Sequence, residues 1–190
     1  MLLTGPINKL GYGVATSNIA HHLGQRIPLR VNPIGPVELN SELQIPFDTS
    51  VDESLSLVIF HQDQLNHPDK ATRKVGWPIF ELNQFRQEEL ECLRRQDQIV
   101  VCSEWARGVL AQYGLSSDVV PLGVDPIIFF PAKGADGPVR FFNIGKWEVR
   151  KGHDFLIKAW KAANIEGELH LCCTNPFLSP LEDENWRKIY

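Results

Sequence analysis

The sequence predicts an α/β protein: a Rossmann-like parallel sheet, followed by the first β-α-β unit of a second Rossmann-like domain. Short apolar runs alternate along the chain with turns marked by Gly or Ser and with segments of helical spacing. This alternation is typical of β-α units that build a parallel sheet. A Pro- and Gly-rich stretch divides the series, so we expect a domain of residues 1–125, a linker of residues 126–138 and a second domain of residues 139–190.

The first domain is expected to begin with a strand and a glycine-containing loop. "MLLTG" at the start is a short apolar run, and a helix is predicted from about Gly13, with one apolar stripe formed by Ala15, Ile19 and Leu23. "SLSLVIF" predicts a buried strand that ends at His61. His61 therefore stands at the end of a predicted strand, where α/β proteins place active groups.

The clearest β-α unit is "QIVVCSEWARGVLAQYG", residues 98–114. Its β-branched run predicts a strand, and Ser103 is a favourable N-cap for the helix that follows. Glu104 suits the first turn because the helix dipole favours negative charge there, and Gly114 is expected just beyond the helix end. "DVVPL" predicts the next strand.

The second domain is expected to open with a single β-α-β unit. "VRFFNI" and "ELHLCC" predict strands, "GKWEVRKG" a turn and "HDFLIKAWKAA" a helix that buries Phe155, Leu156, Ala159, Trp160 and Ala163. Asp154 and Lys158 are placed to pair on its outer face. One such unit cannot bury both faces of a parallel sheet. We therefore expect the second domain to be incomplete, with homo-oligomer formation as one way to cover it.

Composition excludes several classes of protein. The 190 residues carry a net charge of -4, which argues against a nucleic-acid-binding protein. No stretch approaches the roughly 20 apolar residues of a membrane span, and the first residues lack a secretory leader pattern. We therefore expect a cytoplasmic protein without a membrane span. The four cysteines lack zinc-site spacing and are assigned no function.

The turn "GKWEVRKG" is the strongest candidate for binding an anion. In an open α/β sheet, ligands lie at the carboxyl ends of the strands, where a helix N-terminus attracts negative charge. Lys146 and Lys151 flank this turn, and Gly145 and Gly152 leave room for close backbone approach. The expected anion is a phosphate or diphosphate. Spacing alone leaves a solvated basic turn as an equal alternative.

Two segments of the chain together resemble a known family. "NIGKWEVRKGHDFLIKAW" is similar to the G-R-x-x-x-x-K-G stretch that opens the C-terminal domain of GT-B glycosyltransferases of retaining family 4. "VVCSEWARGVLAQYGLSSDVVPLGVDPIIFFP" resembles the end of that family's N-terminal domain. Both occur in the family's order, and "GPINKLGYG" extends the resemblance to most of the chain. The resemblance implies a GT-B protein whose C-terminal domain is truncated.

The resemblance assigns donor-binding roles to four residues. In such enzymes an arginine and a lysine of this turn bind the diphosphate of a nucleotide-sugar, and these roles fall on Lys146 and Lys151. Lys146 departs from the family because lysine offers a point charge where arginine forms a bidentate fork. The "LGYGV" loop resembles the family's Gly-rich loop, so Gly11 and Gly13 would let backbone N–H groups approach the donor.

The resemblance also gives His61 and Glu81 expected roles. In similar enzymes a histidine near this point contacts the sugar or acceptor at the reaction centre, so His61 is the expected catalytic residue. Viewed alone, a single histidine at a strand end is more often a structural hydrogen-bonding residue, and this alternative stays open. "GWPIFELN" resembles a segment near the acceptor cleft, which makes Glu81 an acceptor-side candidate. The chain has no D-x-D motif. No metal or cofactor is therefore expected beside the nucleotide-sugar, for example a UDP- or GDP-sugar.

The expected function is transfer of a sugar from a nucleotide-sugar to a glycan, lipid or other acceptor with retention of configuration. The E-x7-E element and the ribose and base contacts of the family have no counterpart in "LEDENWRKIY", so the chain alone is expected to lack part of the donor site. The alternative is a non-catalytic binding module derived from one half of a glycosyltransferase. An unrelated phosphate-binding Rossmann protein would also explain the turn, but not the "PLGVD" run.

Overall fold

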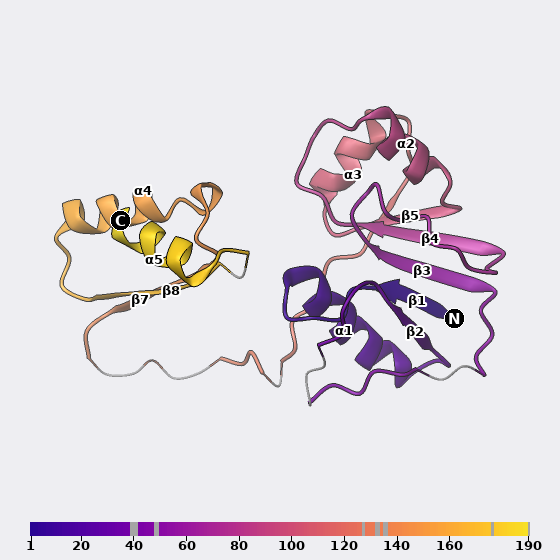
Figure 1. Cartoon of the computed structure of the whole chain (residues 1–190), viewed down its shortest axis with the longest axis horizontal. Helices are drawn as coiled ribbons and strands as arrows, with labels where there is room; N and C mark the ends of the chain where they lie inside the picture. The colour runs from indigo at the N-terminus through magenta and orange to yellow at the C-terminus, as the bar shows by residue number, and fades with distance from the viewer. Residues whose placement is uncertain are drawn as a thin grey trace. The chain divides into compact units, whose positions relative to one another are not determined.

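The chain forms two compact units in the computed structural model, Met1–Pro126 and Ile127–Tyr190, and each is described by itself (Figure 1). The structure describes residues 1–38, 42–47, 50–126, 128–131, 134, 137–175 and 177–189. Both units are built from parallel strands and helices, so the fold class is α/β.

The first unit is a six-stranded parallel sheet in the order β2-β1-β3-β4-β5-β6. Its strands are β1 (Leu2–Gly5), β2 (Arg30–Pro33), β3 (Leu55–Phe60), β4 (Arg73–Pro78), β5 (Gln98–Val101) and β6 (Asp118–Val119). Its helices are α1 (Gly11–Gly24), α2 (Gln87–Arg94) and α3 (Glu104–Ala111). This order is the doubly wound, Rossmann-like arrangement, in which strands are added first on one side of β1 and then on the other.

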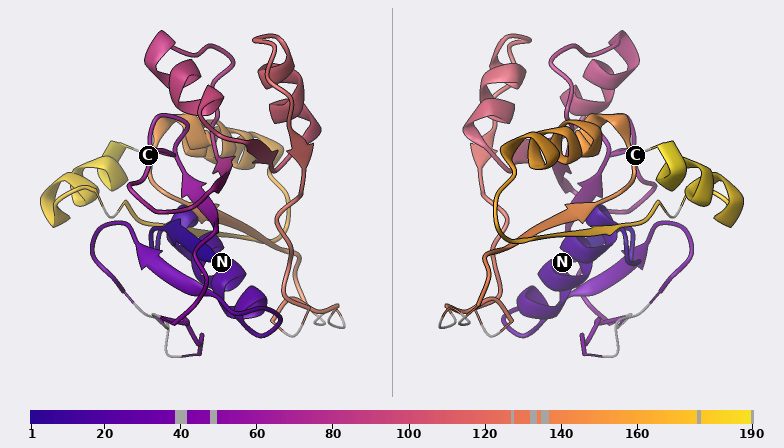
Figure 2. Two further views of the ribbon diagram at one scale, coloured as in Figure 1. Left: turned by 90° about the vertical axis from the view of Figure 1, so that its right-hand side faces the viewer. Right: turned by 90° about the vertical axis from the view of Figure 1, so that its left-hand side faces the viewer.

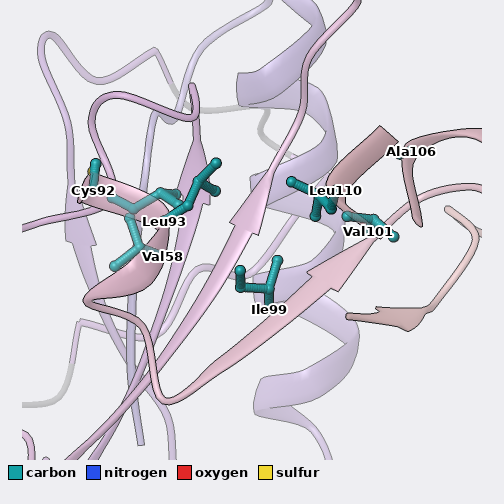
Figure 3. Close-up of a cluster of buried hydrophobic side chains, with 8 residues drawn as sticks. Val58, Cys92, Leu93, Ile99, Val101, Ala106 and Leu110 are labelled. Carbon is teal, nitrogen blue, oxygen red and sulfur yellow. The ribbon is translucent and has the colours of Figure 1, made fainter. Parts of the chain in front are cut away.

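Two apolar clusters cover opposite faces of this sheet. Val58 and Ile59 are successive residues of β3, and successive side chains of a strand point to opposite faces. Val58 joins the cluster under α2 and α3, which is drawn in Figure 3. Ile59 joins the cluster that includes Ala20 of α1. Figure 2 shows α2 and α3 on the side of this unit that lies away from α1. The helices therefore cover both faces, as a parallel sheet requires.

Local sequence signals in the first unit agree with the structure. β1 and β3 fall where the apolar runs predict them, and His61 follows directly after β3. The Ser103 hydroxyl accepts a hydrogen bond from Ala106 N at 3.2 Å, so Ser103 is the N-cap of α3. Gly114 has φ of +71°, a left-handed conformation that favours glycine just past a helix end.

The buried stripe of α1 differs from the predicted one. The helix begins at Gly11 rather than near Gly13, and its most buried side chains are the small residues Thr16, Ser17 and Ala20. Ile19 and Leu23 of the predicted stripe are only half-buried around the core cluster. The helix lies close to the sheet, where small side chains fit better than large apolar ones.

The second unit contains a two-stranded parallel sheet of β7 (Arg140–Gly145) and β8 (Glu168–Cys173). A 3-10 turn (Val149–Lys151) and α4 (His153–Ala163) connect the two strands, and α5 (Pro180–Ile189) follows β8. These bounds match the predicted β-α-β unit closely. The open face of the sheet carries Phe142, which is 62% exposed, and Ile144, which is 80% exposed.

The prediction that α4 buries a broad apolar stripe is wrong. Phe155 is 72% exposed, and Ala159 and Ala163 are exposed as well. Only a narrow strip packs inward: Leu156 is half-buried, and Trp160 meets Phe141 of β7 with ring centroids 5.3 Å apart. The reason is geometric, because a sheet of two strands is too narrow to cover the whole apolar face of a helix.

Candidate functional site

The carboxyl ends of β1 and β3 mark the point where the strand order of the first sheet reverses. β1 pairs with β2 on one side and with β3 on the other, both in parallel register. Ligands of open parallel sheets bind outside such a reversal point. The loop of residues 6–10 follows β1, and His61 follows β3. Two of the predicted site segments therefore lie at the same edge of the sheet.

The loop of residues 6–10 packs closely against the first turn of α1. Asn8 Oδ1 accepts a hydrogen bond from Leu10 N at 3.0 Å, which tightens the loop. A Cβ atom added to Gly13 would lie 2.2 Å from Asn8 Oδ1 and 2.5 Å from Asn8 N. A Cβ atom added to Gly11 would meet nothing within 4 Å. Packing therefore demands glycine at position 13, whereas position 11 faces open space.

The N-terminus of α1 carries positive partial charge at this edge. Leu10 is its N-cap and supplies no side-chain hydrogen bond, and its first turn contains no acidic residue. The first N–H groups of a helix lack partners within the helix, and together with the helix dipole they favour an anion. The sequence at this helix start is therefore compatible with a phosphate or with an electronegative sugar oxygen.

His61 is fixed by contacts with Tyr12, the residue between the two glycines. The Tyr12 hydroxyl lies 3.1 Å from His61 Nδ1 and donates to the Ile79 carbonyl oxygen at 3.2 Å. The rings of Tyr12 and Phe60 lie 4.6 and 4.8 Å from the His61 ring, centroid to centroid. The imidazole is half-buried. His61 is therefore held in one place by two rings and a hydrogen bond.

A buried carboxylate next to this edge is a structural group rather than a site acid. Glu89 of α2 is 4% exposed and accepts hydrogen bonds from Gln62 Nε2 at 2.8 Å and from Arg86 N at 2.6 Å. Burial raises the pKa of Glu89, but these hydrogen bonds, with the Arg86 guanidinium, outweigh it and lower the pKa below its usual value. Glu89 thus stays ionised, caps α2 and anchors the residue after His61.

Glu81 lies at the same edge of the sheet but at its surface. β3 and β4 pair in parallel with Phe60 opposite Pro78, and Glu81 follows the end of β4 by a few residues. Its side chain is exposed. An exposed carboxylate beside a strand end is accessible to a hydroxyl-bearing ligand, which is what the expected acceptor-side role requires.

In the second unit, the basic turn contains its own counter-charge. Glu148 accepts hydrogen bonds from Lys146 Nζ at 2.7 Å and from the Arg150 guanidinium at 3.0 Å. The hydrogen bond from Lys146 is the strongest influence on Glu148 and lowers its pKa below the usual value, although burial opposes this, and Arg150 adds to the lowering. Lys146 Nζ also lies 4.7 Å from the ring centroid of Phe177. An anion at Lys146 would therefore compete with Glu148.

Lys151 offers a less engaged cation. Its side chain is exposed, and within the described part of the chain no ion pair involves its ammonium group. Lys151 N donates to Glu148 O at 2.9 Å, which closes the turn. Gly152 follows with φ of +66°, a left-handed conformation that disfavours residues with a Cβ atom, and α4 begins next. Lys151 therefore stands directly before a helix N-terminus.

Buried hydrogen bonds fix the backbone of this turn. His153 is 1% exposed, and its Nε2 donates to the Lys146 carbonyl oxygen at 2.7 Å. Asn175 Nδ2 donates to the Trp147 carbonyl oxygen at 3.0 Å. The backbone around Lys146 is therefore held from both α4 and the segment after β8.

The structure brings some of the predicted site residues together. Tyr12, which stands between Gly11 and Gly13, contacts His61, and Glu81 follows a neighbouring strand at the same edge. Lys146 and Lys151 belong to the second unit. Sequence reasoning missed Tyr12, although it stands inside the "LGYGV" motif, because nothing local reveals its contact with a histidine 49 residues away.

The other missed residue is Glu148. Glu148 stands in the turn "GKWEVRKG", two residues from both Lys146 and Arg150. An acidic residue between two basic ones indicates ion pairs within the turn, and the structure contains both pairs.

No protein-family model, curated protein or solved structure matches this chain significantly. Among the described residues, no group of three or more His, Cys, Asp or Glu side chains is placed to hold a metal ion. The helices of that same part of the chain also lack the combination of length and apolar character that crossing a membrane requires.

Proposed function

We propose that this chain binds a nucleotide-sugar and is a retaining GT-B glycosyltransferase of the family 4 type, or a part of one. The observation that carries the proposal is the sheet edge at the β1/β3 reversal. There the loop of residues 6–10, the uncapped start of α1 with its two glycines, and the fixed imidazole of His61 lie at one sheet edge. A hydroxyl-rich ligand with a phosphate matches those groups, since the helix end attracts the anion and the imidazole binds a hydroxyl.

The cationic turn of the second unit supplies the donor-binding part of the proposal. Lys151 and Lys146 would face the diphosphate, with the N-terminus of α4 beside them. During transfer, negative charge grows on the departing nucleoside diphosphate, and fixed cations stabilise that charge without a metal ion. Lys151 is the main cation in this proposal because Lys146 is already paired with Glu148.

The reaction-centre roles go to the first unit. His61 would hydrogen-bond a hydroxyl of the transferred sugar or of the acceptor, and Glu81 would contact the acceptor from the exposed edge. The acceptor is a glycan, a lipid or another hydroxyl compound. A cytoplasmic location is part of the same proposal.

A non-catalytic binding module is the second candidate function. It is favoured by the open face of the β7-β8 sheet, where Phe142 and Ile144 are largely exposed. A parallel sheet is normally covered on both faces, so this face is suited to contact with further protein, including a second copy of the chain. In that case the chain would bind without transferring sugar.

Calorimetric titration with UDP-glucose, GDP-mannose, UDP and GDP tests the proposal. The variant is Lys151→Ala, and its matched control is Lys161→Ala, which removes an exposed lysine from the far end of α4. We expect saturable binding of one nucleotide class that Lys151→Ala weakens about tenfold or more, because a charge-assisted contact to phosphate is worth about 1.5–3 kcal/mol. Lys161→Ala should bind like the unmodified chain.

Two results would count against donor binding. If no nucleotide binds, or if both lysine variants lose affinity equally, the turn is not a diphosphate site. Sedimentation of the same samples measures the oligomeric state and tests the binding module. A dimer that Ile144→Glu dissociates would support a module that binds through the open face of the β7-β8 sheet.

A further inference from the structure

Two described contacts of the Tyr12 hydroxyl, with the Ile79 carbonyl oxygen and with His61 Nδ1, cannot both use its single proton. It donates to the Ile79 carbonyl oxygen at 3.2 Å, and a carbonyl oxygen can only accept. The other neighbour, His61 Nδ1, lies 3.1 Å from the same oxygen. Both contacts can be hydrogen bonds only if His61 Nδ1 carries a proton and donates it to the Tyr12 oxygen.

We propose that Tyr12 is a positioning residue that holds neutral His61 in its Nδ1–H form and so makes Nε2 a hydrogen-bond acceptor. In a neutral imidazole one nitrogen donates and the other accepts, so the bond made at Nδ1 decides the state of Nε2. In the described part of the chain, no hydrogen bond occupies His61 Nε2. A solvated histidine favours the opposite, Nε2–H form. The two successive hydrogen bonds, from His61 Nδ1–H to Tyr12 and from Tyr12 to Ile79, therefore move the proton of the neutral ring from Nε2 to Nδ1.

The geometry around His61 makes this assignment stable. Edge-on contact with Tyr12 and tilted contact with Phe60 oppose a turn of the ring about its Cβ–Cγ bond, which would put Cδ2 in the place of Nδ1. Ile79 is fixed in turn, because its N–H donates to the Phe60 carbonyl oxygen at 3.0 Å. The acceptor for the Tyr12 proton is therefore part of the sheet framework rather than a mobile loop.

The consequence concerns the group that His61 can recognise. An accepting Nε2 selects a ligand group that donates, such as a sugar hydroxyl, and it disfavours an anionic oxygen, which has no proton to offer. This step rests on the proposed function, in which His61 contacts the sugar or the acceptor, while helix starts and lysines, not His61, bind the phosphates. The Nδ1–H form of His61 thus gives the site a preference for a hydroxyl group over a phosphate oxygen at Nε2.

Nitrogen-15 NMR of the histidine side chains tests the assignment directly, without any ligand. The full chain is labelled and studied at about pH 8, above the ordinary histidine pKa of about 6.5. His61→Gln identifies the His61 signals among those of the six histidines. We expect the long-range correlation pattern of the Nδ1–H form for His61. Finding the Nε2–H form in the unmodified chain would overturn the proposal.

Tyr12→Phe removes the hydroxyl and keeps the ring. We expect this variant to fold and to shift His61 toward the Nε2–H form. The matched control is Tyr113→Phe, because the Tyr113 hydroxyl also bonds a backbone carbonyl, that of Asn83, at 3.3 Å but does not contact His61. An unchanged His61 pattern in Tyr12→Phe would also overturn the proposal, as would an equal shift in Tyr113→Phe.

A ligand arm separates this inference from the proposed function. Where a nucleotide-sugar binds, Tyr12→Phe should weaken its binding about three- to tenfold, as loss of one oriented hydrogen bond predicts. The parent nucleoside diphosphate, which lacks the sugar hydroxyls, should bind both proteins equally. If no nucleotide-sugar binds but the NMR result holds, the proposed function fails and the role of Tyr12 stands. Equal binding of the sugar by both proteins would overturn the inferred recognition.

Discussion

Replacing Gly13 by alanine tests the packing of the loop at the β1/β3 edge. The new Cβ atom would lie 2.2, 2.4 and 2.5 Å from Asn8 Oδ1, O and N, whereas ordinary contacts begin at 3.4 Å. Two of these atoms belong to the backbone, so rotating a side chain cannot relieve the clash. The whole loop or the start of α1 must move. Overpacking of this kind costs about 1–3 kcal/mol of unfolding free energy.

Gly11→Ala is the matched control for this experiment. It makes the same chemical change in the same helical turn, but its Cβ atom would have nothing within 4 Å. Alanine is favoured over glycine in a helix by about 0.5–1 kcal/mol, so Gly11→Ala should leave stability unchanged or raise it. Gly13→Ala is thus expected to lower the free energy of unfolding, and Gly11→Ala is not.

Urea unfolding of both variants, followed by circular dichroism, measures the difference. Hydrogen exchange of peptides from Met1–Pro126 then shows whether the loss is in the first unit, because the chain has two units and need not unfold in one step. Equal stability of Gly13→Ala and Gly11→Ala, or an exchange increase confined to residues beyond Pro126, would contradict this packing of the loop.

Three further predictions follow from single contacts. Ser103→Ala removes the hydrogen bond to Ala106 N and should cost about 1 kcal/mol in urea unfolding, while Ser103→Asp, which can still cap, should cost much less. Glu89→Gln should destabilise the chain at neutral pH by about 1–2 kcal/mol. Because the folded pKa of Glu89 is lowered, its stabilising contribution is complete above the unfolded pKa of about 4.3 and is lost as the pH falls through the folded pKa. The unfolding curves of the two proteins should therefore converge in acid, and a stability difference that does not change with pH would contradict this. Glu148→Gln should tighten the binding of pyrophosphate about two- to fivefold in calorimetry, because a half-exposed ion pair worth up to about 1 kcal/mol no longer competes for Lys146, and weaker binding would show that Glu148 supports the site instead.

Local signals predicted the secondary structure well wherever one short stretch of sequence decides the conformation. The N-cap at Ser103, the left-handed Gly114 and the bounds of β7, α4 and β8 depend on neighbours within a few residues. The buried face of α4 was predicted wrongly for a different reason. Helical periodicity shows that an apolar stripe exists, but the width of the partner decides how much of it is covered, and two strands leave Phe155 in solvent.

The candidate site shows the same division. The sequence pointed to Gly11, Gly13 and His61 as separate residues at loop and strand ends. It could not show that Tyr12 joins them, because that contact crosses 49 residues and depends on β1 and β3 lying side by side. Nor did charge counting show that Glu148 binds two of the three cations of its turn.

The sequence by itself determined the α/β class, the order of most elements and the positions of the glycines and cations, because these depend on periodicity, capping and turn chemistry over short distances. Only the tertiary structure decided the strand order, the faces that remain open, the partner of His61 and the counter-ion of Lys146. The physical reason is that these features are contacts between atoms that folding brings together, and their geometry decides which proton or charge each group carries.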